Sequence, residues 1–221
     1  MLRRLAGRFM IATISICMTI YLLRHGETAL NVARVLQPAD TPLSLRGAAQ
    51  AHALARRMRS TGLVGVVSSH LPRAMQTAQI IGNECGLEVQ TCELLQERNF
   101  GDWRGLAHDS MNFNPLVSAD APPSGETARE FAARVAQAFE HITNLRAGMN
   151  GPLAVVTHGM LIRQLLSSHV TLEAGCGLPV HLGNTSVSRI AACVPYRVEL
   201  LNCTRHLDDK IAHDASSLSA G

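Results

Sequence analysis

Apolar and polar residues follow one another along this chain in blocks that predict strands and helices by turns. Six short apolar runs are typical of strands: Thr19–Arg24, Leu63–Ser68, Leu87–Thr91, Leu153–Thr157, Ser186–Ala192 and Arg197–Leu201. Longer stretches with apolar residues at helical spacing lie among them: Thr28–Ala33, Arg46–Arg59, Pro72–Glu84, Thr127–Leu145 and Met160–Ser168. Strands that alternate with helices of this length predict βαβ units and a largely parallel sheet.

Residues that favour helix starts stand where these stretches begin. Thr28 and Ser44 come just before helical stretches, where a hydroxyl caps the first turn, and Pro72 suits a first turn itself. From residue 96 to residue 123 the periodicity is poor, and we expect only a short helix near Ala107–Leu116. The sequence therefore predicts one irregular segment before the longest helix.

The length of 221 residues suits a single domain with one core. We expect this domain to span residues 18–203, between an N-terminal extension of residues 1–17 outside the fold and a polar C-terminal tail of residues 204–221. The apolar stretch Phe9–Leu23 superficially resembles a signal peptide, but cleavage after it would remove the first strand. It is also short for a membrane span. An upstream start and a targeting role both stay open for the extension.

Composition and charge exclude several function classes. The chain is 47% hydrophobic and only 17% charged, which is typical of a globular protein. Three of its 20 basic residues lie in the first 17 positions, where there is no acid, so the remainder holds 17 basic and 17 acidic residues. A neutral body with 4% aromatic residues gives little for nucleic acid to bind. We expect neither a nucleic-acid partner nor a membrane partner.

The six cysteines show no C-x-x-C pair and no regular spacing. In a chain of this size they predict reduced, mostly buried thiols of a cytosolic protein, and hence a cytoplasmic location. The sequence also lacks the H-E-x-x-H and paired C-x-x-C patterns of zinc sites. We therefore expect neither a bound metal nor a cofactor.

Two predicted strands end in a histidine followed by a glycine. Thr19–Arg24 leads into His25-Gly26, and Leu153–Thr157 leads into His158-Gly159. In an open α/β sheet, the carboxyl ends of strands meet the N-termini of helices, and ligands bind there. Backbone N–H groups at a helix N-terminus favour phosphate above all. The sequence thus predicts phosphoryl chemistry at this edge of the sheet.

The side chains expected at this edge suit phosphoryl transfer through an enzyme intermediate. His25 can attack as a neutral imidazole, while Arg24 and Arg73 offer planar forks that match phosphate oxygens. His158, once protonated, would add a charged donor. Glu97 follows the third strand and can protonate the leaving alcohol, then activate water. Each residue alone could be a structural histidine or a surface charge, but their coincidence at three strand ends favours a site.

Six motifs stand in one order along the chain: Arg24–Thr28 (R-H-G-E-T), Asp40–Gly47, Ser68–Ala78, Glu97–Gly105, Val155–Gly159 and Asn184–Ser186. With them the chain resembles the histidine phosphatase superfamily, in its phosphoglycerate-mutase-like branch, from about Thr19 to Ile190. The resemblance implies a three-layer α/β sandwich, with a mostly parallel sheet flanked by helices on both faces, and catalysis without a metal.

The same resemblance assigns roles to individual residues. His25 would be the phosphorylated nucleophile, Glu97 the acid and base, and Arg24, Arg73 and His158 the phosphate pocket. It adds Asn31 and Gly159 as further phosphate-binding residues. The chain departs from the pattern at Arg104, where many members have glutamate, and mildly at Ser44, where threonine is usual. We expect Arg104 to face solvent; the alternative is that it adds positive charge at the distal end of the substrate.

The predicted reaction is metal-independent hydrolysis of small phosphorylated metabolites, through a phosphohistidine. Only Leu106 to Pro123 separates the acid segment from the longest helix, and the mutases of the family have a longer insertion there. Phosphoglycerate mutase remains the alternative. Met111–Pro123 is expected to cover the pocket and to set specificity. The partner is a small phosphorylated metabolite; the oligomeric state stays open, a dimer included.

Two hypotheses from other function classes stand beside this one. Cys92 and Arg98 formally match the C-x-x-x-x-x-R pattern of cysteine phosphatases, but the residues between them are bulky or acidic instead of small. A non-catalytic module that binds phosphate ligands would keep the same fold. The sequence shows no missing catalytic residue that would favour such a module.

Overall fold

The computed structural model describes residues 19–118 and 121–212. The expected extension of residues 1–17 therefore lies outside the described residues, as do residues 213–221 of the polar tail. No helix in the described part of the chain is long and apolar enough to cross a membrane.

One six-stranded sheet forms the middle of the molecule, in the order β3-β2-β4-β1-β5-β6. The strands are β1 (Thr19–Arg24), β2 (Gly65–Ser68), β3 (Val89–Thr91), β4 (Leu153–Thr157), β5 (Val187–Ala191) and β6 (Val198–Cys203). The first four in sequence run parallel, whereas β5 pairs antiparallel with β1, and β6 with β5. The β5–β6 connection is too short for a crossover, so these strands form a hairpin. The sheet is mixed, with the predicted parallel part at its centre.

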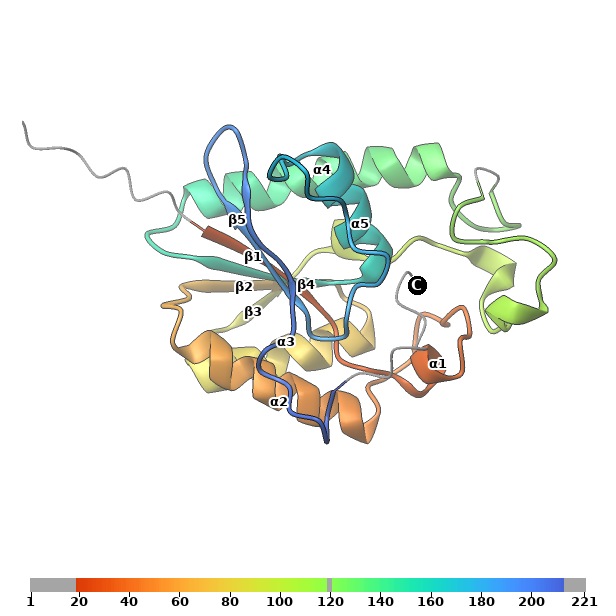
Figure 1. Ribbon diagram of the computed structural model, residues 1–221, viewed down its shortest axis with the longest axis horizontal. Coiled ribbons are helices and arrows are strands. Elements are labelled where there is room, and N and C mark those ends of the chain that lie inside the picture. Colours follow the sequence, from red (N-terminus) through yellow and green to blue (C-terminus); the bar gives the residue numbers. More distant parts are fainter. Residues whose placement is uncertain (1–18, 119–120, 213–221) are drawn as a thin grey trace, which may run out of the picture.

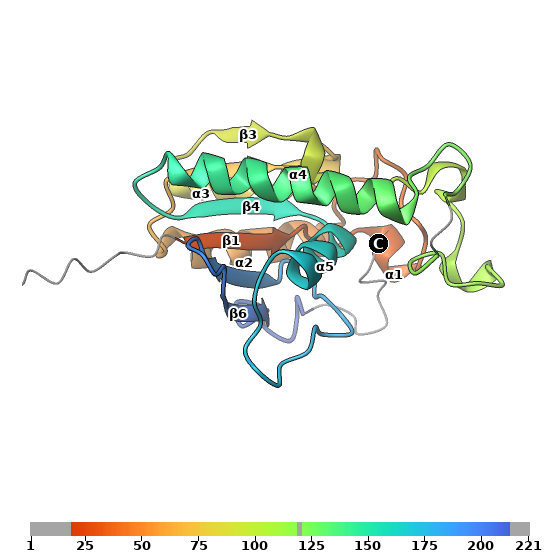
Figure 2. The ribbon, with the colours of Figure 1, turned by 90° about the horizontal axis from the view of Figure 1, so that it is seen from above.

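Helices cover both faces of the sheet, which confirms the predicted three-layer α/β architecture (Figures 1 and 2). The helices α2 (Leu45–Arg59) and α3 (Pro72–Cys85) lie on one face, and α4 (Ala128–Ala147) and α5 (Gly159–Ser168) lie on the other. The short α1 (Ala29–Val32) follows β1. The predicted strand positions and the five long helical stretches are thus confirmed, with bounds that differ by a few residues.

Alternate residues of the central strands fill two separate cores. On β1, Ile20 and Leu22 pack into the core beneath α4 and α5, whereas Leu23 packs into the core beneath α2 and α3. On β4, Val155 belongs to the first core and Val156 to the second. Because both faces of these strands are covered, their apolar side chains enter both cores.

Side-chain caps begin the helices where the sequence places them. Thr28 and Thr127 each form a capping box at the start of α1 and α4. The hydroxyl of Ser44 accepts a hydrogen bond from Gly47 N (3.0 Å) at the start of α2. The prediction of a helix near Ala107–Leu116 is wrong, because only a single 3-10 turn, η3 (His108–Ser110), forms there. Pro115 disfavours helical conformation in the residue before it.

The first part of the polar tail packs against the domain. The side chain of Gln50 on α2 donates to the carbonyl of Ile211 (2.9 Å). His206 hydrogen-bonds through its two ring nitrogens to Arg57 (3.2 Å) and Thr185 (3.1 Å). Residues 204–212 therefore lie against α2 and the loop before β5.

The expectation of reduced, mostly buried thiols holds only for the reduced state of four cysteines, and not for burial or for Cys193. Free thiols are found at Cys85, Cys92, Cys176 and Cys203, and none of these four side chains is fully buried. Cys193 is disulfide-bonded. The two cores are filled by aliphatic side chains from the central strands, while Cys85 ends α3 and Cys203 ends the edge strand β6.

Candidate active site

The predicted histidines meet at the carboxyl end of the sheet because β1 and β4 are neighbours in register. Arg24 pairs with Thr157, so the next residue of each strand, His25 and His158, lies at the same edge. The backbone N–H of His25 donates to Thr157 O (2.9 Å), and the two imidazole rings are 5.1 Å apart between centroids. The parallel ladder thus sets the distance between the two rings.

The imidazole of His25 is held in one orientation by its own backbone neighbour. Its Nδ1 lies 2.7 Å from the carbonyl oxygen of Gly26, which can only accept, so Nδ1 carries the proton. Nε2 is buried and has no hydrogen-bond partner among the described residues. Burial, then the charges of Arg73 and Arg24, hold the pKa of His25 well below its usual value. The free enzyme therefore presents a neutral imidazole with an available lone pair on Nε2.

His158 ends β4 and occupies the N-cap position of α5. Its Nε2 lies 2.8 Å from the hydroxyl of Ser69, a residue that the sequence analysis did not single out. Burial, followed by the nearby charge of Arg73, lowers the pKa of His158 well below its usual value. His158 is therefore neutral before an anion binds, not already protonated.

Arg24 and Arg73 bring two buried guanidinium groups to the same place. Burial lowers the pKa of each to about 10, opposed in both cases by the charge of Glu97. Both remain charged at neutral pH. Arg24 Nη1 donates to the carbonyl of Leu182, and Arg73 Nη1 donates to the carbonyl of Pro38 (3.3 Å). Backbone carbonyls on two loops thus orient the two forks.

Glu97 is the buried acid of this site, only 4% exposed. Its Oε1 accepts from Arg98 N (3.0 Å), and its Oε2 accepts from Met160 N (3.2 Å) in the first turn of α5. Burial raises the pKa of Glu97 despite these hydrogen bonds and the charges of Arg73 and Arg24. A carboxyl group with a raised pKa can carry a proton at a pH where an exposed glutamate has lost it.

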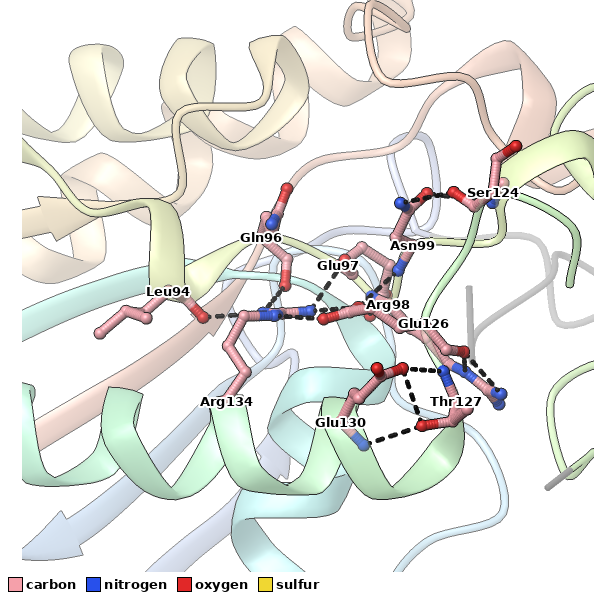
Figure 3. A network of polar contacts seen from close by, with 11 residues as sticks. Leu94, Gln96, Glu97, Arg98, Asn99, Ser124, Glu126, Thr127, Glu130 and Arg134 are labelled. Atoms are coloured by element: carbon pink, nitrogen blue, oxygen red, sulfur yellow. Dashed lines mark hydrogen bonds and ion pairs between the residues drawn. The ribbon is translucent and has the colours of Figure 1, made fainter. Parts of the chain in front are cut away.

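A second arginine network, missed from the sequence, holds the backbone that carries Glu97 (Figure 3). Arg134 on α4 donates to the carbonyls of Leu94 (2.8 Å), Gln96 (2.8 Å) and Glu97 (3.2 Å). Its guanidinium also binds both carboxylate oxygens of Glu126, at 2.7 and 2.8 Å. The arginine lies in the middle of a predicted helix, where its spacing carries no sign of this role.

Asn31 and Gly159 lie close to this site. Asn31 Oδ1 accepts hydrogen bonds from Thr28 N (3.1 Å) and from Asn184 Nδ2 (3.3 Å), and the same Nδ2 donates to the carbonyl of His25 (3.2 Å). Gly159 is the buried first residue of α5, directly after His158. Asn31 is thus linked to the backbone of His25 through Asn184.

Close backbone contact explains a glycine in the second motif. A Cβ on Gly47 would lie 2.0 Å from the carbonyl oxygen of Glu27, so only glycine lets α2 approach the loop after His25. On the other side, Gly26 N donates to Thr77 Oγ1 (3.0 Å) on α3. The loop that follows His25 is thus held between α2 and α3.

A small cavity adjoins this site, lined by Gln37, Arg73, Glu97, Arg98, Phe100 and Arg104. Arg104 is half-buried and lines this cavity, so the expectation that it faces solvent is wrong. The chain turns sharply at Gly105 (φ +87°), whose N–H donates to Leu36 O (2.7 Å). This tertiary contact places the residue before it at the cavity.

The segment expected to cover the pocket borders this cavity. Ser118 O accepts a hydrogen bond from Arg98 Nη1 (3.0 Å), and Phe113 makes an edge contact with Trp103 (5.0 Å between ring centroids). No group of three or more histidine, cysteine or acidic side chains in the described ranges is arranged to hold a metal ion. The segment between Cys92 and Arg98 presents backbone carbonyls to Arg134, unlike a loop of N–H groups that cradles phosphate.

Comparison with known proteins identifies related sequences. The family model described as the histidine phosphatase superfamily (branch 1) matches residues 20–200. The probable phosphoglycerate mutase GpmB of Yersinia pestis is 37% identical over 182 residues, which cover 77% of this chain and 83% of that protein.

Solved structures agree with this assignment. YhfR of Bacillus stearothermophilus superposes with a TM-score of 0.74 at 28% identity, covering 86% of this chain and 99% of its own. A mycobacterial glucosyl-3-phosphoglycerate phosphatase superposes with a TM-score of 0.71 at 28% identity, covering 84% and 99%.

Proposed function

This chain belongs to the histidine phosphatase superfamily, and from that premise we propose that it hydrolyses small phosphomonoesters through a phosphohistidine on His25. The relatives it matches include phosphatases, and the chain is an enzyme of this class. The observation that carries the proposal is the state of His25: Nδ1 is bound to the Gly26 carbonyl, and Nε2 has no partner among the described residues.

In the first step, the lone pair of His25 Nε2 attacks phosphorus and the bond from phosphorus to the ester oxygen breaks. Arg24 and Arg73 bind the non-bridging oxygens and stabilise the charge that spreads over them. Glu97 gives its proton to the departing alcohol, which its raised pKa favours. His158 and Asn31 are proposed to contact the phosphoryl group, and so is the N–H of Gly159 at the start of α5.

In the second step, Glu97 acts as the base. Its carboxylate takes a proton from a water molecule, whose oxygen attacks the phosphorus of the phosphohistidine. The bond from phosphorus to Nε2 breaks, and its electron pair returns to the imidazole. Phosphate leaves, and both His25 and Glu97 regain their starting states. The cycle needs neither a metal nor a cofactor.

The lining of the cavity supports a phosphorylated substrate, because Arg73 and the proposed acid Glu97 both line it. The segment Met111–Pro123 is proposed to lie over the bound ester, since its Ser118 carbonyl binds Arg98 at the cavity wall.

Phosphoglycerate mutase activity is a second candidate, favoured by the 37% identity to a protein named as a probable phosphoglycerate mutase. The two reactions share the first step and differ in the acceptor of the phosphoryl group, which is water in a phosphatase and a substrate hydroxyl in a mutase. A short connection between the acid segment and α4 supports the phosphatase.

Phosphate release from a panel of monoesters, with a chelator present, tests the proposal. We expect hydrolysis in the wild type, none in His25→Ala, and a phosphohistidine that rapid acid-free quenching traps in the wild type. Activity retained in His25→Ala, or loss of activity with chelator, would contradict the mechanism. Isomerisation of 3-phosphoglycerate without phosphate release would assign the chain to the mutases.

We further propose that residues 18–203 form the catalytic domain and that it works in the cytoplasm. Free thiols at Cys85, Cys92, Cys176 and Cys203 support the location, because disulfides are rare in that compartment. Thiol labelling of the protein in intact cells tests it, and a disulfide at Cys193 that persists there would contradict it.

A further inference from the structure

The cavity that Arg73 and Glu97 line holds more positive charge than one phosphoryl group needs. Arg73, Arg98 and Arg104 line it together, against a single acid, Glu97. Burial raises the pKa of that acid, so its negative charge is weakened as well. A phosphomonoester dianion would be bound by Arg73 and the buried Arg24 beneath it. The charge of the remaining arginines is then left to other parts of the substrate.

Two of the three lining arginines, Arg98 and Arg73, already donate hydrogen bonds to backbone carbonyls. Arg98 donates to the carbonyls of Ser118 (3.0 Å) and Glu126 (3.3 and 3.2 Å), which fixes its guanidinium in the cavity wall. Arg73 is 2% exposed and donates to the carbonyl of Pro38. Its place next to Arg24 and Glu97 assigns it to the phosphoryl group in the proposed mechanism.

Arg104 differs from both, since its side chain has no hydrogen bond or ion pair to any residue in 19–118 or 121–212. The charge of Glu126 acts on it. That carboxylate, however, is already bound by the guanidinium of Arg134 (2.7 and 2.8 Å) and by Asn99 N (2.8 Å). The half-buried Arg104 side chain thus has five N–H donors at the cavity that no described residue accepts.

The charge of Arg104 reaches the floor of the cavity. Repulsion from Arg104 is one of the causes that lower the pKa of Arg73 to about 10, after burial. Two guanidinium groups that repel each other across one cavity are stabilised together by a ligand that places negative charge at both. A single phosphate at Arg73 relieves only one end of this arrangement.

We propose that Arg104 binds a second anionic group of the substrate, so that this enzyme prefers phosphomonoesters that also carry a carboxylate or a second phosphate. This inference rests on the proposed function, because it takes the phosphoryl group to sit at His25, Arg24 and Arg73. The planar fork of arginine matches either anion through two parallel hydrogen bonds.

A matched set of esters tests the inference. 3-Phosphoglycerate and glycerol 3-phosphate have the same carbon chain and differ by a carboxylate in place of a hydroxymethyl group, and 1,3-propanediol bisphosphate carries a second phosphate instead. In Arg104→Gln, we expect kcat/KM to fall about 10–100-fold for 3-phosphoglycerate and for 1,3-propanediol bisphosphate, because a charge-assisted bond to the second anion is lost. The fall is expected to come from a higher KM. For glycerol 3-phosphate we expect a change of less than about threefold. Loss for one of the two anionic esters alone would identify the second anion.

Two variants control for charge and for stability. Arg104→Lys keeps a charge without the fork and is expected to recover part of the loss. Arg129→Gln removes an exposed arginine on α4 and is expected to change neither ester. Equal losses for the anionic and neutral esters in Arg104→Gln, or no loss for either, would overturn the inference.

A failure of the proposed function would be distinguishable from a failure of this inference. If wild-type enzyme releases phosphate from none of the esters, the proposed function is refuted. Calorimetric binding of 3-phosphoglycerate and glycerol 3-phosphate to His25→Ala then decides the role of Arg104 without catalysis. A preference for 3-phosphoglycerate that Arg104→Gln abolishes supports the inference, and no preference overturns it.

Discussion

Replacing Arg134 with lysine tests whether its hydrogen bonds to the backbone around Glu97, here called the clamp, are needed for proton transfer. Arg134 makes five hydrogen bonds: three to the carbonyls of residues 94, 96 and 97, and two to Glu126. A lysine ammonium has three donors on one atom and cannot reach both groups of acceptors. At least two charge-assisted bonds are lost, each worth about 1.5 kcal/mol, so we expect about 3 kcal/mol less stability.

The loss of the clamp is also expected to slow the reaction selectively. A displacement of Glu97 by about 1 Å would cost up to 100-fold for an alkyl ester, whose leaving alcohol must be protonated. For 4-nitrophenyl phosphate, whose leaving group departs without a proton, we expect a fall of less than about fivefold. Steady-state kinetics on glycerol 3-phosphate and 4-nitrophenyl phosphate measure this split, and urea denaturation shows that the variant is folded.

Arg129→Lys, an exposed substitution on the same helix, serves as the control and is expected to behave as wild type. Equal losses on the two esters would show that Arg134 supports the whole site and not the acid in particular. Unchanged kinetics on both esters would refute the reasoning altogether.

Three further predictions concern pH and packing. In Glu97→Gln, turnover of alkyl esters is expected to fall about 10²–10⁴-fold and the alkaline limb of the pH profile to disappear; a limb that persists would assign the acid elsewhere. His25 and His158 have lowered pKa values in the folded chain, so the unfolded chain takes up their protons first as pH falls below about 6.5. The free energy of unfolding should then fall by up to about 1.4 kcal/mol per pH unit for each histidine, with no such dependence above pH 6.5, and urea titrations that show a flat profile between pH 7 and pH 5 would contradict this. Gly47→Ala is expected to cost about 2 kcal/mol, or about 4–8 °C in Tm, because its Cβ would meet the carbonyl of Glu27; an unchanged Tm in calorimetry would show that α2 can shift freely.

The parts of the fold that sequence reasoning predicted well are those with a local physical cause. The predicted bounds of β1 and β4 are confirmed. Each strand is an apolar run that is covered on both faces and that ends at a polar residue. The starts of α2 and α4 follow from hydroxyl caps at Ser44 and Thr127, which act within one turn. The meeting of His25 and His158 follows from the parallel pairing of their strands.

What could not be predicted depends on contacts between distant segments. Arg104 lines the cavity because Gly105 hydrogen-bonds to Leu36, and no local pattern encodes that contact. Arg134 looks like any polar residue of a helix until the segment before Glu97 packs against it. The disulfide at Cys193 has no spacing signal in the chain.

The pairing of β1 with β4 has a consequence for the synthesis and folding of the protein. The proposed nucleophile His25 lies near the start of the chain, but the strand that supports it is made more than a hundred residues later. Contacts so distant in sequence form late and slowly in folding. A nascent or truncated chain that carries His25 but lacks His158 is therefore expected to be catalytically silent. Catalytic competence would arise only once synthesis has passed α5, and recovery of turnover after refolding would report completion of the central sheet.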